Sequence, residues 1–336
     1  MESFAFWYEK KDAEDSQEEL SAVMNFNLWH ECGWGTKRCR FGRTRKNKYP
    51  YLDIGFKLRN LHLAQKLYFF LPFQLSEDEK AEHLVDLGEK FNKTELVDAI
   101  FNESYTTTIA ANRKVIRVED SIGQKFDIYQ LDMIHDVHLE PFADGTIMQI
   151  PTHNIRASGR EEQGEYYLRF RIQGKPLPFL IHEYKTPSMA FQSIFNTTHM
   201  IDFRYHNIRS LHKSLIERFS QGKNRIVRVS AVHFLLVTKA FIDVVGKDFK
   251  STRKLEQGVW KDYVEGNDTE DLVAYHHVNK AGPEEEYIPS SELFIKYKVE
   301  RSLLLPYLLF TIALGACGSA LWSALWSIVL QPLFGL

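Results

Sequence analysis

A carboxylate and an amine lie two residues apart at the end of an apolar run in the middle of the chain. The run is FLIHEYK at residues 179–185, and it contains Glu183 and Lys185. A carboxylate can hold a divalent metal ion, and a lysine can polarise a phosphate or the water that attacks it. Glu183 and Lys185 are therefore candidates for metal-dependent phosphodiester cleavage. The alternative is that a Glu-x-Lys tripeptide arises by chance.

This string resembles the second half of the PD-(D/E)xK nuclease motif. The resemblance covers only Glu183 and Lys185. It implies an acidic partner on the preceding strand, and Glu165 would have to take that place, because no aspartate lies between residues 165 and 182. Pro176 and Pro178 interrupt the hairpin that the motif requires.

Other common catalytic motifs are missing from the sequence. It contains neither of the glycine-rich phosphate loops, G-x-x-x-x-G-K-[ST] and G-x-G-x-x-G, and no G-x-S-x-G nucleophile elbow. The adjacent His276 and His277 would point to opposite faces of a strand, and no cysteine or third histidine lies nearby at a familiar metal spacing. Outside the nuclease alternative we predict no cofactor and no metal site, and an enzymatic role is not favoured.

A dense basic segment spans residues 37–48, KRCRFGRTRKNK, and contains no acidic residue. Trp29, Trp34 and Phe41 are close enough in sequence to offer stacking surfaces. We predict an anion-binding surface here, with anionic phospholipid as the simplest partner and nucleic acid as its competitor. The alternative is a solvated loop between strands. The basic residues are Lys37, Arg38, Arg40, Arg43, Arg45, Lys46 and Lys48.

Charged and aromatic residues also alternate at 202–209, where a predicted strand gives way to a helix. Arg204 and Arg209 have the chemistry to receive an anionic ligand such as a nucleotide phosphate. The favoured alternative is that they pair with Asp202 and Glu217 inside the fold.

The last part of the chain, residues 302–336, contains no charged side chain. A run of 18 or more apolar residues is the signature of a membrane-spanning helix. We predict a single span over 307–330, because a hairpin turning at Gly315 and Gly318 would leave halves of only about 22 Å against a core of about 30 Å. Lys296, Lys298 and Arg301 precede the segment, and basic flanks stay on the cytoplasmic side.

Small residues recur every fourth position along this predicted span, at Gly315, Ser319, Ser323 and Ser327. This spacing places them on one slowly drifting stripe of a helix, where small side chains let two backbones approach closely. We predict self-association through this stripe. The alternatives are a simple anchor without a partner, or several copies whose serines line a narrow polar path.

The rest of the chain has the composition of a globular protein. Of 336 residues, 44% are hydrophobic and 26% are charged, and the net charge of -2 gives no overall attraction to nucleic acid or anionic lipid. Alternating and apolar runs predict strands at 51–58, 66–73, 113–119, 124–131, 145–151, 165–172, 225–237 and 272–278. Helices are predicted after residue 76 and at 94–101, 208–219 and 252–264.

We therefore expect an α+β fold with a β-rich, sandwich-like soluble region and a C-terminal transmembrane helix. The glycine-flanked polar stretch at 158–164 predicts a domain boundary. The expected organisation is an N-terminal β-rich domain at 1–157, a second α+β domain at 164–280, a connector at 281–301 and a transmembrane tail at 302–336.

This layout predicts a single-pass, tail-anchored membrane protein with most of the chain in the cytoplasm. Its soluble region would act as a sensor or scaffold that controls self-association of the membrane segment, triggered by an unknown ligand or protein. The layout resembles that of prokaryotic membrane-disrupting defence effectors. Two alternatives remain open: a non-toxic scaffold that binds lipid or nucleic acid through 37–48, and a membrane-tethered nuclease centred on Glu183 and Lys185.

Overall fold

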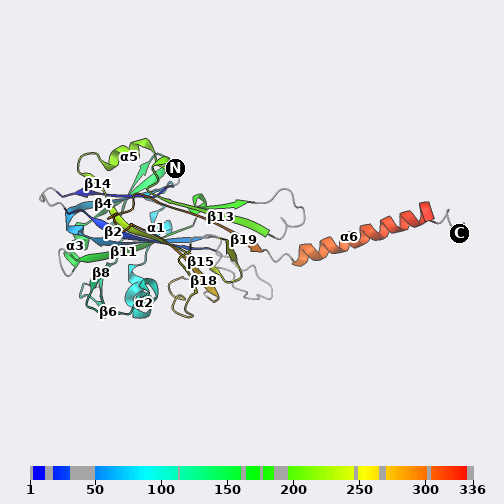
Figure 1. Cartoon of the computed structure of the whole chain (residues 1–336), viewed down its shortest axis with the longest axis horizontal. Helices are drawn as coiled ribbons and strands as arrows, with labels where there is room; N and C mark the ends of the chain where they lie inside the picture. Colours follow the sequence, from blue (N-terminus) through cyan, green and yellow to red (C-terminus); the bar gives the residue numbers. More distant parts are fainter. Residues whose placement is uncertain are drawn as a thin grey trace. The chain divides into compact units, whose positions relative to one another are not determined.

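A computed structural model gives the fold, and most of its regular structure is β-sheet (Figure 1). It describes residues 3–11, 18–30, 50–112, 114–159, 164–174, 177–184, 196–245, 249–264, 270–300 and 304–330. The chain divides into two compact units. The first contains Met1–His182 and Met200–Lys296, and the second contains Glu183–His199 and Tyr297–Leu336.

The largest sheet has ten strands, and β3 and β11 lie near its middle. Most neighbours are antiparallel, whereas β15 pairs with β2 and β11 with β8 in parallel. In order, the strands are β17 (Ser251–Lys254), β18 (Leu272–Lys280), β15 (Arg228–Lys239), β2 (Ser21–Trp29), β3 (Tyr51–Arg59), β11 (Glu165–Gln173), β8 (Lys125–Tyr129), β7 (Val115–Asp120) and β6 (Tyr105–Ile109), with β5 (Leu84–Asp86) also paired to β11.

The other strands of the described residues form two smaller sheets. One has the order β14 (Asn224–Ile226), β1 (Ala5–Lys10), β4 (Ala64–Leu71), β10 (Gly145–Pro151) and β9 (His138–Phe142). The other has the order β12 (Ile181–Tyr184), β13 (Asn196–Tyr205), β19 (Ser291–Glu300) and β16 (Asp243–Val245). The division between the two compact units falls within β12, β13 and β19.

The helices are short except for the last one. The α-helices are α1 (Lys80–His83), α2 (Thr94–Phe101), α3 (His153–Ser158), α5 (Lys213–Phe219) and α6 (Leu304–Leu325), and α6 continues into a π-helical turn at Trp326–Leu330. Single 3-10 turns lie at Leu61–Leu63, Gly88–Asn92, Leu177–Phe179 and Ile208–Ser210.

Buried phenylalanines join the five-stranded sheet to the ten-stranded sheet. The ring of Phe69 on β4 lies 5.2 Å from that of Phe56 on β3 and 6.4 Å from that of Phe170 on β11. Phe6 on β1 lies 4.9 Å from Phe56. Aromatic pairs at such distances add specific contacts to the burial of apolar area.

The opposite face of the ten-stranded sheet is covered as well. A second core there includes Trp29, Phe91, Tyr167, Trp260 and Tyr263. Strands β3 and β11 are therefore buried along nearly their whole length. The alternation at 51–58 is typical of a half-buried strand, but both faces of β3 are covered, so only the predicted strand itself is confirmed.

Most of the predicted strands are present, and the helix at 94–101 is confirmed as α2. The helix predicted at 252–264 is wrong. Residues 251–254 form β17 instead and pair with β18, and Gly258 follows with φ +89°, which breaks helical geometry. The apolar spacing that suggested a helix comes from Leu255, Trp260 and Tyr263. Leu255 reaches the second core directly after β17, and the other two reach it from turns.

The stretch 158–164, where a domain boundary was predicted, lies between strands of one sheet. Strands from both sides of it share the ten-stranded sheet, since β11 pairs with β3 and β15 pairs with β2.

The stretch 281–301, predicted as a connector, contains a strand. Residues 291–300 form β19, whose side chains alternate between buried and exposed from Ser291 to Val299.

Removing the ring of Phe69 tests the core between the two sheets. We expect Phe69→Ala to lower the free energy of unfolding by about 3–5 kcal/mol, because it leaves a cavity between three rings. Chemical denaturation of the detergent-solubilised chain measures this change. Phe294→Ala is the matched control: Phe294 is 60% exposed, so the expected change is below about 0.5 kcal/mol. Equal losses in the two variants would contradict this core.

Candidate functional site

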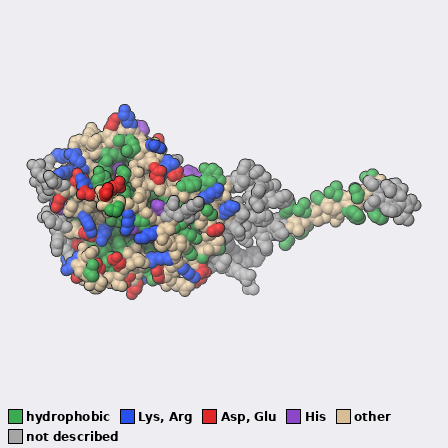
Figure 2. Space-filling view, in the orientation of Figure 1, with side chains coloured by type: hydrophobic (Ala, Val, Ile, Leu, Met, Phe, Trp, Pro, Cys, Tyr) green, Lys and Arg blue, Asp and Glu red, His purple; other side chains and the backbone are tan. Residues whose placement is uncertain are grey.

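One helix, over Leu308–Ile328, is long and apolar enough to cross a membrane. Its 21 residues span about 31 Å at 1.5 Å per residue, close to the hydrocarbon thickness of a bilayer. All of its side chains are exposed, and Figure 2 shows no charged side chain along α6. The helix is continuous through Gly315 and Gly318, so the structure has one helix here and no hairpin.

The predicted small-residue stripe lies on this helix. Gly315 and Ser319 are exposed, and a Cβ atom on Gly315 would meet nothing within 4 Å. The hydroxyl of Ser323 donates to the carbonyl oxygen of Ser319 at 2.9 Å, and that of Ser327 donates to the carbonyl oxygen of Ala324 at 3.2 Å. These serines satisfy their own donors within the helix, as a lipid environment requires.

The other predicted site residues are only partly described. The basic segment with Lys37, Arg38, Arg40, Arg43, Arg45, Lys46 and Lys48 lies outside the described residues, as does Lys185. Glu183 is on β12. Its proposed partner Glu165 is on β11, in a different sheet, where its carboxylate forms ion pairs with Lys57 and Arg59.

Arg204 and Arg209 have different environments. Arg204 donates to both carboxylate oxygens of Asp202, at 3.0 and 2.5 Å, and to the hydroxyl of Ser210 at 2.7 Å. This pairing with Asp202 is the alternative that the sequence favoured. Arg209 is exposed in the 3-10 turn Ile208–Ser210, and Glu217 pairs instead with Lys213 at 3.9 Å.

The structure also assembles a buried ionic cluster that the sequence did not reveal. Asp53 on β3 is fully buried, and its carboxylate accepts hydrogen bonds from Arg171 at 2.6 and 3.1 Å, from Trp29 Nε1 at 2.8 Å and from the Tyr263 hydroxyl at 2.7 Å. Arg169 Nη2 lies 3.7 Å from the same carboxylate. Two arginines therefore share one aspartate.

Arg169 is held by tyrosine and amide oxygens. Its Nε donates to the Tyr263 hydroxyl at 2.7 Å and its Nη1 to the Tyr167 hydroxyl at 2.9 Å. In the amide orientation that satisfies its neighbours, Asn27 accepts from Arg169 Nη2 at 2.6 Å. Gly55 makes room for this network, because a Cβ there would lie 2.3 Å from the Tyr167 hydroxyl oxygen.

The charges of this cluster are fixed by their contacts. Burial by itself would raise the pKa of Asp53, but the charge and hydrogen bonds of Arg171, with the charge of Arg169, hold that pKa below its ordinary value. Burial raises the pKa of Tyr167 and of Tyr263, so both hydroxyls stay protonated and neutral. The cluster then carries two positive charges and one negative charge.

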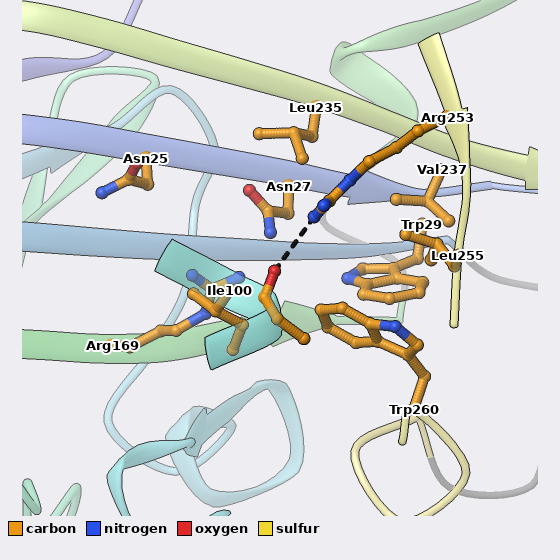
Figure 3. A pocket seen from close by; sticks show the side chains of 11 residues that line it. Asn25, Asn27, Trp29, Ile100, Arg169, Leu235, Val237, Arg253, Leu255 and Trp260 are labelled. Atoms are coloured by element: carbon orange, nitrogen blue, oxygen red, sulfur yellow. Dashed lines mark hydrogen bonds between the residues drawn. The ribbon is translucent and has the colours of Figure 1, made fainter. Parts of the chain in front are cut away.

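A small cavity of about 30 Å³ lies beside Arg169. Figure 3 shows the side chains of Arg253, Asn27, Trp29 and Trp260 around it, with Arg253 donating to the carbonyl oxygen of Ala99 at 3.0 Å. A water molecule needs about 10–15 Å³ of such space, so the cavity has room for about two waters. Pockets for organic ligands are about tenfold larger or more. The cluster is therefore a structural centre rather than a substrate site.

One sequence feature points away from this cluster, and another could have pointed to it. Asp53, Arg169 and Arg171 occupy polar positions of alternating strands, which normally indicate a solvent-facing side. Arg169 and Arg171 lie two residues apart, so they must share one face, but only the cover over that face makes them partners of Asp53.

Among the described residues, no group of three or more His, Cys, Asp and Glu side chains is arranged to hold a metal ion.

No protein-family model matches this chain, and no curated protein matches it either.

Removing the charge of Asp53 tests the cluster. We expect Asp53→Asn to lower the free energy of unfolding by about 3–5 kcal/mol, because it leaves two buried arginines without a counter-charge. Asp262→Asn is the control, since Asp262 also pairs with a basic side chain, Lys93, but is exposed; no measurable change is expected there. Urea denaturation compares the two. An Asp53→Asn variant as stable as the parent would disprove the role assigned to the cluster.

Proposed function

We propose that the helix Leu308–Ile328 anchors the chain in a membrane and that the soluble region acts as a sensor or scaffold for this membrane segment. One observation carries this proposal: every described side chain of Leu308–Ile328 is exposed, and none is charged. Water is an unfavourable solvent for such a surface, at about 25 cal/mol for each Å² of apolar area, whereas lipid is a favourable one.

The proposed orientation leaves the soluble region in the cytoplasm. Lys296 and Lys298 are exposed on β19 just before the helix, and Arg301 follows them in sequence. The segment after the helix contains no charged residue. Basic residues next to a span favour the cytoplasmic side, so this asymmetry supports our assignment.

The soluble region supports the scaffold part of the proposal. The five-stranded and ten-stranded sheets contact each other through Phe6, Phe56 and Phe69, which favours a sandwich-like body. A body stabilised by its own buried cores does not need the helix for its fold. The helix is then available to respond to the clustering of such bodies.

Self-association through the stripe Gly315, Ser319, Ser323 and Ser327 is the proposed output. Because Ser323 and Ser327 bond to carbonyls of their own helix, the stripe suits close helix packing better than a polar path. In the proposed mechanism, a ligand or partner clusters the soluble bodies, the stripes meet, and the bilayer is perturbed.

Placing charge in the middle of the helix tests the membrane assignment. We expect the double variant Leu314→Arg with Leu321→Arg to leave the membrane fraction, since each arginine costs about 2.5–3.5 kcal/mol at the centre of a span. Ultracentrifugation of lysates without detergent measures the partition. Ile122→Arg is the control, because Ile122 belongs to the first compact unit and its side chain is 78% exposed. A parent chain that stays in the supernatant would refute the proposal.

Enlarging the stripe tests self-association. Ser319→Leu with Ser323→Leu is expected to reduce crosslinked oligomers in vesicles at least severalfold and to reduce dye leakage with them, because bulky side chains separate the backbones. Leu321→Ala with Leu325→Ala changes a different helix face and should leave both measurements near the parent values. Unchanged crosslinking and leakage in the serine variant would count against the stripe.

A further inference from the structure

The first compact unit contains a pocket large enough for an organic ligand. Its volume is about 580 Å³, within the range of about 300–1,000 Å³ that is usual for small-molecule sites. It lies at the edge strand β14, beside α5 and the segment 287–289. Its wall includes Tyr205, His206, Ile216, Phe219, Ile226 and Ile288.

Apolar side chains form most of this wall, and several are exposed to water. Ile208 is 69% exposed, Ile226 48% and Tyr287 46%. Isolated exposed apolar residues are normal on a protein surface, but these three line one concave site. A ligand with an apolar body would remove them from water.

His206 is held in an unusual backbone conformation at this wall. Its φ is +49°, in the left-handed region that non-glycine residues seldom adopt. Two hydrogen bonds fix the position: His206 N donates to Phe4 O at 2.8 Å, and Asn207 N donates to Ser3 Oγ at 3.0 Å. Such strained residues cluster at functional sites.

The imidazole of His206 contacts the backbone of β1. Its Nε2 lies 2.8 Å from Phe6 N and 3.0 Å from Phe6 O. Burial lowers the pKa of His206 to about 4, so the ring is neutral near pH 7. The wall presents no histidine charge at that pH.

Two arginines lie at the rim of the pocket, and they differ in their partners. Arg228 forms ion pairs with Glu19 and with Glu286. Arg225 donates only to the carbonyl oxygens of Gly222 and Asn224, at 3.2 and 2.7 Å, and no carboxylate pairs with it among the described residues. Arg225 therefore keeps a positive charge for an external anion.

We propose that this pocket binds a small amphiphilic anion, with an apolar body against Ile226 and Phe219 and a carboxylate or phosphate group at Arg225. Binding at this site does not depend on the membrane anchor. The role of such a ligand as the trigger for clustering does rest on the proposed function.

Octanoate and its neutral analogue octanamide are suitable probes. The full-length chain is placed in lipid nanodiscs, and the shift of the thermal unfolding midpoint is titrated against each probe, with empty nanodiscs correcting for partition into lipid. We expect octanoate to bind at least severalfold more tightly than octanamide. Arg225→Gln should weaken octanoate about tenfold, since a hydrogen bond to a charged group is worth about 1.5 kcal/mol or more, and should leave octanamide unchanged.

Two further variants make the test specific. Ile226→Glu adds a negative charge to the exposed wall and should weaken both probes, octanoate more strongly. Arg117→Gln removes an exposed arginine of β7, outside the pocket, and should change neither. Equal binding of the two probes, or octanoate binding that survives both pocket variants, overturns the proposal.

The same measurements distinguish a failure of the pocket proposal from a failure of the proposed membrane function. If neither probe binds while the chain still sediments with membranes, the pocket proposal is wrong and the anchor remains. If octanoate binds as expected but the parent chain stays in the supernatant without detergent, the pocket stands and the proposed membrane function is wrong.

Discussion

The central strands β3 and β11 are covered on both faces over most of their length, so a polar side chain in the buried stretch must find its partners inside the protein. Asp53 is the point where this constraint is met, because its single carboxylate joins Arg171, Trp29 and Tyr263. Tyr263 belongs to the turn region after β17, far from β3 in sequence. The cluster therefore ties a turn segment to the middle of the ten-stranded sheet, and loss of the carboxylate would leave buried positive charge in its place.

The C-terminal helix presents the opposite situation. Its apolar side chains have no cover at all among the described residues, whereas Ser323 and Ser327 bond to the backbone of their own helix. In the Asp53 cluster of the first compact unit, charged groups are buried and paired. Along the helix, apolar groups are exposed, and the hydroxyls of Ser323 and Ser327 are satisfied locally. The same rule on unsatisfied groups explains both parts, with protein as the surrounding medium in one and, in our proposal, lipid in the other.

The pocket at β14 adds a third kind of surface. Ile208, Ile226 and Tyr287 there are exposed rather than buried in a core. They line the same pocket as the strained His206 and Arg225, which has no carboxylate partner among the described residues. Stability does not require this combination. Strain at a pocket wall is retained where function uses it, which is why this site and not the buried cluster is our candidate for ligand recognition.

The sequence by itself determined the apolar helix, most of the strands and the helix at 94–101, because those signals are local: an uncharged run, alternation along a strand, or one apolar stripe. It could not determine which strands cover which face. Asp53, Arg169 and Arg171 therefore looked solvent-facing, and Leu255, Trp260 and Tyr263 suggested a helix at 252–264 where the chain forms β17 and turns. The pocket around His206 was equally hidden, since its wall joins residues from 19 to 289. Only tertiary structure decides such features, because burial and pairing depend on segments brought together from distant parts of the chain.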